Sequence, residues 1–344
     1  MNKIESGEKL DFHNVLIRPK RSTLNSRSEV DLEREFKFKY SSKTWKGIPI
    51  IAANMDSTGT FEVCECLSNY KMITALHKFY KPEDYKKFYE KQIHPDHFMI
   101  STGINNEAIE KLKEVFKVIS CNWICIDIAN GYISKLVEFC QKVREEFPDK
   151  IIVAGNVVTR EIVEELILNG KVDVVKVGIG PGSACTTRLK TGVGMPQLSA
   201  VLECADAAHG VGGHIISDGG ITCPGDMAKA FGGGADFVMV GGRFAGHDQN
   251  PGDVEEIDGK KYKFFHGMSS DKAQQTHYGK MEKYRASEGR VLKIPYKGDL
   301  NETVQDYLGG LRSTCTYINA STMKNMAKCT TFIRVSQQVN ELFK

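Results

Sequence analysis

The chain has 344 residues, of which 26% are charged, and its formal net charge is only +3. Basic and acidic residues are mixed along the whole length without a long basic stripe, so we expect no nucleic-acid partner. No apolar run approaches the roughly 18 residues that a membrane-spanning helix needs, and the first residues lack the apolar core of a signal peptide. We therefore expect a cytoplasmic protein with no membrane contact.

The ten cysteines are scattered, and most of them lie inside apolar segments such as 63–67 and 121–126. Cys64 and Cys66 are too close together, and have too few neighbouring ligands, to indicate a zinc site. Reduced cysteines in a reducing compartment fit this distribution best.

Short apolar segments recur along the chain, each followed by a polar or glycine-rich tip. Their apolar character is continuous rather than alternating, which is typical of parallel strands buried on both faces. Helix-like stretches such as 105–118 and 133–147 lie between them, and successive strands start about 21 to 28 residues apart, the span of one βα unit. The pattern predicts an α/β protein, a closed (β/α)₈ or TIM barrel, in a single domain over residues 1–344. The eight segments are 48–55, 72–77, 97–103, 123–130, 151–156, 172–180, 214–220 and 236–242.

The spacing from the sixth to the seventh segment is longer, about 42 residues, and the excess begins with GPGSACTTRLKTGVG (180–194). Extra residues after a barrel strand lie at the C-terminal face, where barrel enzymes have their active sites. Cys185 lies in this loop beside glycines that permit a tight turn, so we predict a nucleophile there. A structural, buried role is the alternative, and it suits the other nine cysteines. Thr186 and Thr187 are weaker candidates for a proton relay, and Arg188 for support of a thiolate.

Two pairs of glycines end the seventh and eighth segments, in SDGGI (217–221) and MVGGR (239–243). Either pair alone is as easily an ordinary turn. Together, at successive barrel strands, they favour a phosphate site built from backbone amides. Asp218, just before the first pair, is suited to accept hydrogen bonds from ribose hydroxyls.

After the eighth segment the chain is polar from 246 to 289, and we predict a flap over the C-terminal face. Within it, GDVEEIDGKKYKFF is typical of a hairpin around Asp258-Gly259. Glu288 is by default a solvated carboxylate. Lys78, at the tip of the second segment, is a phosphate ligand or simply solvated, and His77 beside it is expected to pack in the barrel.

The loop VKVGIGPGSACTT (175–187) closely resembles the nucleophile loop of the inosine-5′-monophosphate dehydrogenase / GMP reductase family. The resemblance extends nearly from end to end, through PIIAANMDSTGTF, IDIANGY, AGNVVT, HIISDGG and YRASEG. It implies a (β/α)₈ barrel that usually assembles as a homotetramer. In the reductase branch, which the chain resembles more closely, Cys185 would add to C2 of the purine of GMP. Loss of ammonia and hydride transfer from NADPH would then yield IMP, with Thr187 and Glu288 as the proton relay.

The resemblance also implies three sets of ligand contacts. For GMP they are Asp218, Gly219, Gly220, Gly241, Gly242, Gly267, Met268, Ser269, Arg285, Ala286, Ser287 and Gly289. For NADPH they are Ser26, Arg27, Lys78, Asp127, Ile128, Ala129, Tyr284, Ser313, Thr314, Cys315 and Thr316. For a monovalent cation, K⁺, they are Gly180, Gly182, Cys185 and Arg188.

Two other functions remain as alternatives. One is an IMP dehydrogenase that lacks its regulatory domain, because no CBS-type module is inserted between the second and third segments. The flap QQTHYGKMEKY (274–284) lacks the Arg-Tyr pair that activates water in dehydrogenases, which argues against hydrolysis. The other is a catalytically silent purine-nucleotide sensor. Arg243 and His266 depart from the reductase pattern near the expected nucleotide site, which puts fine substrate preference in doubt, and Lys171-Val172 lengthens a loop by one residue.

Overall fold

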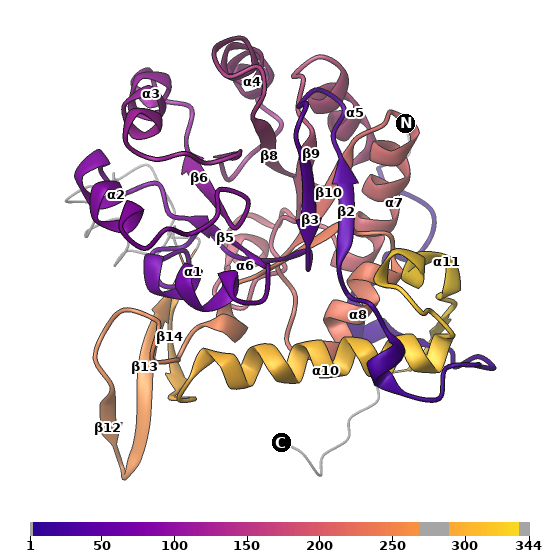
Figure 1. The fold of residues 1–344 in the computed structure, drawn as a ribbon. Helices are drawn as coiled ribbons and strands as arrows, with labels where there is room; N and C mark the ends of the chain where they lie inside the picture. Colours follow the sequence, from indigo (N-terminus) through magenta and orange to yellow (C-terminus); the bar gives the residue numbers. More distant parts are fainter. Residues whose placement is uncertain (1–2, 268–288, 337–344) are drawn as a thin grey trace.

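The computed structural model describes residues 3–267 and 289–336. Eight parallel strands close into a barrel in the order β10-β11-β4-β5-β6-β7-β8-β9 (Figure 1). Each strand lies within, or nearly within, one of the apolar segments, so the predicted TIM barrel is confirmed. The strands are β4 (Ile50–Ala52), β5 (Ile73–Leu76), β6 (Phe98–Thr102), β7 (Trp123–Asp127), β8 (Ile151–Val157), β9 (Val174–Val177), β10 (His214–Asp218) and β11 (Phe237–Val240).

Helices surround the barrel and cover the outer faces of its strands (Figure 1). The stretches predicted at 105–118 and 133–147 form α3 (Ala108–Val118) and α4 (Ser134–Glu146), which confirms both. Only α2 (Pro82–Tyr89) lies between β5 and β6, where no inserted module was expected. The others are α1 (Phe61–Ser68), α5 (Arg160–Leu168), α6 (Thr187–Thr191), α7 (Gln197–Gly210), α8 (Pro224–Gly232), α10 (Leu300–Ile318) and α11 (Met326–Cys329).

The barrel strands are buried on both sides, which explains their continuous apolar character. All four residues of β5 and of β9 are buried, and Ile50 and Ile51 of β4 have no exposed surface. Lys176 of β9 differs from these apolar residues, because it is a charged side chain inside a fully buried strand. Burial of a charge requires compensating partners, and these lie in the site described below.

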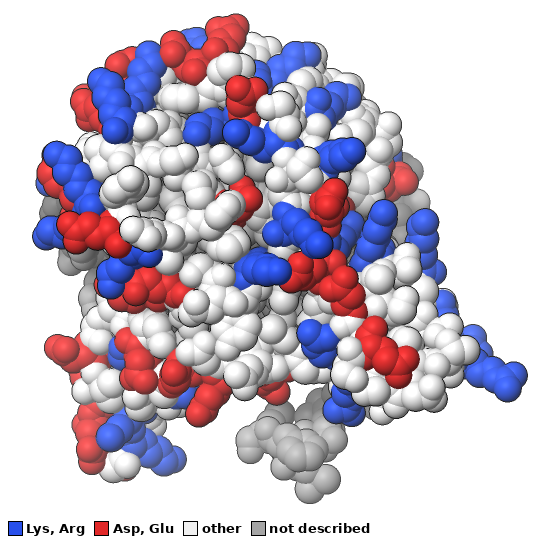
Figure 2. Space-filling view, in the orientation of Figure 1, with Lys and Arg blue, Asp and Glu red and all other residues white. Residues whose placement is uncertain are grey.

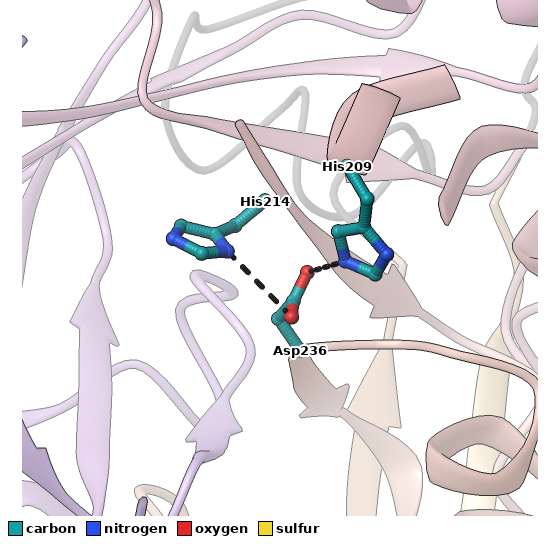
Figure 3. Close-up of side chains that lie close together, drawn as sticks. All are labelled: His209, His214 and Asp236. Atoms are coloured by element: carbon teal, nitrogen blue, oxygen red, sulfur yellow. Dashed lines mark hydrogen bonds and ion pairs between the residues drawn. The ribbon is translucent and has the colours of Figure 1, made fainter. Parts of the chain in front are cut away.

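The N-terminal ends of the barrel strands are closed by a hairpin of β2 (Arg34–Lys37) and β3 (Thr44–Gly47). Asp236 joins several elements at this end of the barrel through its side-chain contacts. Its carboxylate accepts hydrogen bonds from His209 Nε2 at 2.8 Å and from the Ile215 amide at 3.0 Å. His214 Nδ1 lies 3.6 Å from the same carboxylate (Figure 3). The Arg34 guanidinium lies 3.7 Å from it. Burial alone would raise the pKa of Asp236, but its histidine partners hold that pKa well below the usual range.

An antiparallel sheet of β12 (Glu255–Ile257), β13 (Lys260–His266) and β14 (Val291–Pro295) projects from the barrel (Figure 1). Asp258 and Gly259 connect β12 and β13 with φ values of 52° and 72°, as a two-residue hairpin turn requires. The predicted hairpin is therefore confirmed. The rest of the predicted flap, 268–288, lies outside the described residues.

Further short elements complete the described chain. Strand β1 (Val15–Ile17) pairs with β15 (Phe332–Arg334), so a segment near the start of the described chain lies beside one near its end. The 3-10 helices are η1 (Phe12–Asn14), η2 (Arg27–Glu29), η3 (Gly242–Phe244) and η4 (Met323–Asn325). None of the helices within 3–267 and 289–336 is long and apolar enough to cross a membrane. Lysine, arginine and acidic side chains are interspersed over the face shown in Figure 2, as the mixed sequence predicts.

All ten cysteines are free thiols. The expectation that all nine cysteines other than Cys185 are buried is wrong for two of them, because Cys223 is exposed and Cys329 is half-buried. Cys223 precedes α8 at its N-terminus, where the chain passes over the surface, so neighbouring residues do not cover it.

Candidate active site

A cavity of about 1120 Å³ opens at the C-terminal ends of the barrel strands. Its volume exceeds what one mononucleotide fills, so it has room for a second ligand beside the first. Most of the predicted site residues that the structure describes line it. They are Lys78, Asp127, Ile128, Ala129, Gly180, Gly182, Cys185, Thr187, Arg188, Asp218, Gly219, Gly220, Gly241, Gly242, Gly267 and Gly289.

Cys185 is half-buried at the wall of this cavity. Its thiol donates a hydrogen bond to the Thr187 hydroxyl, with 3.2 Å between Sγ and Oγ1, and its amide donates to the Gly182 carbonyl at 3.0 Å. Seven of the other thiols are buried, and the exposed Cys223 and half-buried Cys329 do not line the cavity. Burial raises the pKa of Cys125, inside the barrel, to about 12, with Asp127 adding to the effect. Access to the cavity and a hydroxyl partner set Cys185 apart.

The chain that follows the undescribed segment is fastened to the Cys185 loop. Gly289 pairs with Cys185 as an antiparallel bridge, and the Arg290 amide donates to the Ala184 carbonyl at 3.0 Å. The Arg290 guanidinium donates two further bonds to the Ser183 carbonyl, at 2.9 and 3.0 Å. The end of the predicted flap thus meets the Cys185 loop directly.

Arg188 secures the other side of that loop. Its stem passes between Gly180 and Gly194, where an added Cβ would lie only 2.6 and 2.7 Å from Arg188 Cγ. Its guanidinium pairs with Asp11 at 3.2 Å and donates to the Met195 carbonyl at 2.6 Å. These contacts fasten the loop to the N-terminal segment, and support of a thiolate by Arg188 stays a prediction.

The two glycine pairs lie next to each other, because β10 and β11 pair in parallel with Asp218 opposite Met239. Gly219 and Gly220 have φ values of +89° and +79°, in the left-handed region that glycine adopts without strain. A Cβ added at Gly242 would lie 2.8 Å from the Ser183 hydroxyl. Ser183 therefore faces the predicted phosphate site, a contact that the sequence analysis missed because serine is common in loops.

Asp218 belongs to a network that the sequence analysis also missed. Its Oδ2 accepts from Lys176 Nζ at 2.5 Å and from Asn156 Nδ2 at 2.8 Å. Lys176 also pairs with Asp127 at 2.9 Å, and Asn54 donates to the other oxygen of Asp127 at 3.0 Å. A lysine within an apolar run was the available signal, since a buried cation requires anionic partners.

The opposite charges within this network favour the ionised forms of Lys176 and Asp127. Burial by itself would lower the pKa of Lys176, but Asp127 and Asp218 raise that pKa above its ordinary value. Burial opposes ionisation of Asp127 as well, and the Lys176 ammonium lowers its pKa nonetheless. Lys176 is thus an ammonium ion between two carboxylates at the floor of the cavity.

The residues predicted for NADPH fall into two groups. Lys78 and residues 127–129 line the cavity, whereas Ser26, Arg27 and residues 313–316 do not. The second group lies on η2 and α10, which contact each other, and Ser26 and Arg27 are exposed there. Cys315 is fully buried, so its side chain is not available to a ligand.

Several predicted residues lie outside the described chain, namely Met268, Ser269, Tyr284, Arg285, Ala286, Ser287 and Glu288. The side chain of His266 lies outside it as well. Arg243 is exposed, does not line the cavity, and donates from Nε to the Tyr307 hydroxyl on α10 at 3.3 Å. The Arg243 side chain thus contacts α10 in this structure, and an effect of Arg243 on substrate preference stays a prediction.

Comparison with known proteins gives a consistent answer. A family model described as "IMP dehydrogenase / GMP reductase domain" matches residues 9–341. The chain is 57% identical to a GMP reductase of Yersinia enterocolitica over 346 residues, which cover 99% of each chain. It is 56% identical to a GMP reductase of Caenorhabditis elegans over 347 residues, 100% of this chain and 96% of the relative. The chain therefore belongs to the IMP dehydrogenase / GMP reductase family.

Proposed function

We propose that this protein is a GMP reductase, which converts GMP to IMP and ammonia with oxidation of NADPH to NADP⁺. The observation that carries the proposal is Cys185, a half-buried thiol at the cavity wall, bonded to Thr187 and next to two glycine pairs. Relatives that match over nearly their whole length bear the same name, which supports the assignment.

Cys185 is the nucleophile of the proposed reaction. Its sulfur forms a bond to C2 of the guanine ring, and the 2-amino group leaves as ammonia, so that C2 remains bound to sulfur as a thioimidate. NADPH, when bound, supplies the hydride to C2. Cleavage of the C2–S bond then returns the thiolate and releases IMP. A thiolate suits both steps because it is a good nucleophile and a good leaving group.

Thr187 and Glu288 provide the proton transfers. The amino group must be protonated before it leaves, because an amide anion is a poor leaving group. The thiol of Cys185 already donates to the Thr187 hydroxyl at 3.2 Å, so the proton released from sulfur has an acceptor. The pairing of Gly289 with Cys185 supports a role for its sequence neighbour Glu288 in this relay.

The GMP phosphate binds the backbone amides of the glycine pairs, with the hydroxyl of Ser183 as a further donor. Asp218 accepts from the ribose hydroxyls. The remaining contacts to the nucleotide are those of Gly267, Met268, Ser269 and residues 285–289.

Lys78 and residues 127–129 hold one part of NADPH within the cavity. Ser26, Arg27 and residues 313–316 hold another part on η2 and α10. Because the second group does not line the cavity of its own chain, the division supports a cofactor that bridges two subunits of a homotetramer. The carbonyls of Gly180, Gly182, Cys185 and Arg188 suit K⁺, and Arg188 offers only its carbonyl because a guanidinium has no free lone pair.

A single barrel domain and a cytoplasmic location complete the proposal, and ten free thiols are consistent with a reducing compartment. The runner-up functions remain a dehydrogenase without its regulatory domain and a silent nucleotide sensor. They differ from the reductase in the reaction that the purified protein catalyses.

The decisive experiment incubates the protein with GMP and NADPH, then separately with IMP and NAD⁺, while absorbance at the reduced-cofactor band and ammonia release are followed. Oxidation of NADPH matched by ammonia identifies the reductase, reduction of NAD⁺ identifies the dehydrogenase, and neither change identifies the sensor. Cys185→Ala should abolish turnover and retain GMP binding. Cys223→Ala, at an exposed thiol that does not line the cavity, is the matched control and should keep full activity.

A further inference from the structure

Lys176 is a buried lysine between two carboxylates that are proposed for different ligands. We infer that Lys176 is a positioning residue that couples the GMP site to the cofactor site, because it is the shared counter-ion of Asp218 and Asp127. The inference rests on the proposed function, which assigns Asp218 to the ribose of GMP and Asp127 to the cofactor. Nothing in the sequence analysis gave Lys176 a role.

The geometry is that of a bridge. Lys176 Nζ lies 2.5 Å from Asp218 Oδ2 and 2.9 Å from Asp127 Oδ1. Its side chain is only 4% exposed, whereas those of Asp218 and Asp127 are 18% and 32% exposed. All three residues line the cavity. The ammonium is therefore inaccessible to most of the solvent, while both carboxylates keep a surface toward a ligand.

The bridge leaves a defined acceptor for the substrate. Lys176 and Asn156 both donate to Oδ2 of Asp218. No hydrogen bond from residues 3–267 or 289–336 to Oδ1 is present, so this oxygen keeps its lone pairs for ribose hydroxyls. Asn156 also donates to the Gly178 carbonyl at 2.7 Å, which ties the arrangement to the loop that carries Cys185.

The charge of the network argues for coupling and against a purely structural role. One ammonium and two carboxylates sum to −1. Removal of the ammonium would leave two anions facing each other with little water, a state that is strongly disfavoured. Removal of the ammonium together with the Asp127 carboxylate would restore the charge to −1. The loss of GMP binding caused by Lys176→Met should therefore be partly restored by Asp127→Asn, a substitution at the carboxylate proposed for the cofactor.

Within residues 3–267 and 289–336, no cation other than Lys176 forms an ion pair with either carboxylate. The uncharged Cys125 thiol lies on β7 and Asn54 follows β4, while the Lys78 side chain follows β5 and acts on Asp127 from the cavity side. Gly155 of β8 packs against the lysine so closely that a Cβ there would lie 2.4 Å from the Lys176 carbonyl. This packing fixes the strand that presents the ammonium.

The test is a cycle of Lys176→Met, Asp127→Asn and the double variant, measured as GMP binding by calorimetry, without NADPH. Lys176→Met should weaken GMP binding at least about 30-fold, as expected when one partner of a buried charge pair is removed. The double variant Lys176→Met/Asp127→Asn should recover at least half of that loss on a logarithmic scale. Lys190→Met, at an exposed lysine of α6, should bind GMP as the wild type does.

Each other outcome is decisive. The inference is overturned if folded Lys176→Met binds GMP as tightly as the wild type. It is also overturned if the double variant loses as much binding free energy for GMP as the two single variants together. If Lys176→Met does not fold, the double variant must fold and bind GMP, and its failure to fold also overturns the inference. Wild-type protein that binds no GMP would instead refute the proposed function, and the two failures are therefore distinguishable.

Discussion

The carboxylate of Asp11 lies 3.2 Å from the guanidinium of Arg188, although the two residues are 177 positions apart in the chain. The other oxygen of Asp11 accepts from the Gln197 amide at 2.5 Å, at the start of α7. A single carboxylate thus ties the N-terminal segment to both ends of the stretch that follows Cys185, from Arg188 to Gln197. This contact makes the N-terminal segment part of the active-site architecture.

We predict that Asp11→Ala lowers kcat about tenfold and destabilises the fold by about 1–3 kcal/mol, because it leaves the half-buried Arg188 and the Gln197 amide without their acceptor. NADPH oxidation and urea unfolding measure the two effects. Glu5→Ala, at an exposed carboxylate of the same segment, is the control. Normal kcat in a folded Asp11→Ala protein would contradict a role for this pair in ordering the loop.

Gly178 is where β9 turns into the nucleophile loop. Its φ is +149°, and a Cβ there would lie 2.2 Å from the Asp218 carbonyl. We expect Gly178→Ala to lower the free energy of unfolding by about 3 kcal/mol or more. Two effects contribute, namely backbone strain and overlap of the new Cβ with a rigid backbone atom. Gly192→Ala tests strain alone, since its φ is +72° with open space around the new Cβ, and it should cost about 1 kcal/mol. If thermal unfolding shows equal losses of stability for Gly178→Ala and Gly192→Ala, the close contact with the Asp218 carbonyl does not matter.

Arg243 offers a test of substrate preference at a position that departs from the reductase pattern. Because its side chain contacts Tyr307 and does not line the cavity, Arg243→Met should leave KM for GMP within about twofold of wild type, as for most surface substitutions. A larger change in KM would show that Arg243 acts on the nucleotide after all.

Arg243→Met should also change how the stability of the fold depends on pH above pH 8. Burial, with a contribution from Arg243, lowers the pKa of Lys297 to about 8. Between pH 8 and 10 the unfolded chain therefore binds more protons than the folded one at this lysine, and the contribution of Lys297 to stability rises with pH. Arg243→Met brings the folded pKa closer to its ordinary value, so the rise should shrink in pH-dependent thermal unfolding. An unchanged rise would exclude the interaction.

His247 should make the fold sensitive to acid. Burial, assisted by Lys297, lowers its pKa to about 4, and its Nε2 lies 2.7 Å from the Thr303 hydroxyl. As the pH falls from about 6.5 to 4, the unfolded chain takes up a proton here that the folded chain does not, so stability falls with pH. The difference between Tm at pH 7 and at pH 5 should be smaller in His247→Gln, and an equal difference would contradict the prediction.

The fold was predictable because it is encoded in local patterns. Continuous apolar runs such as 172–180 become strands buried on both faces, and Asp258-Gly259 becomes the predicted turn. The place of Cys185 followed in the same way, because residues after a parallel barrel strand lie at the C-terminal face. Each inference depends on residues that are close together in the sequence.

The partners of the site residues were not predictable in this way. Lys176 was read as part of an apolar strand, yet only the closure of the barrel brings Asp127 and Asp218 to its ammonium. The ion pair between Arg188 and Asp11 likewise joins residues far apart in the chain, and no local pattern indicated it. The sequence by itself determined the barrel, its family and the place of the Cys185 loop, since these depend on local periodicity and a short motif. The tertiary structure alone decided which charges meet, because pairing across the barrel depends on contacts between strands that no local pattern records.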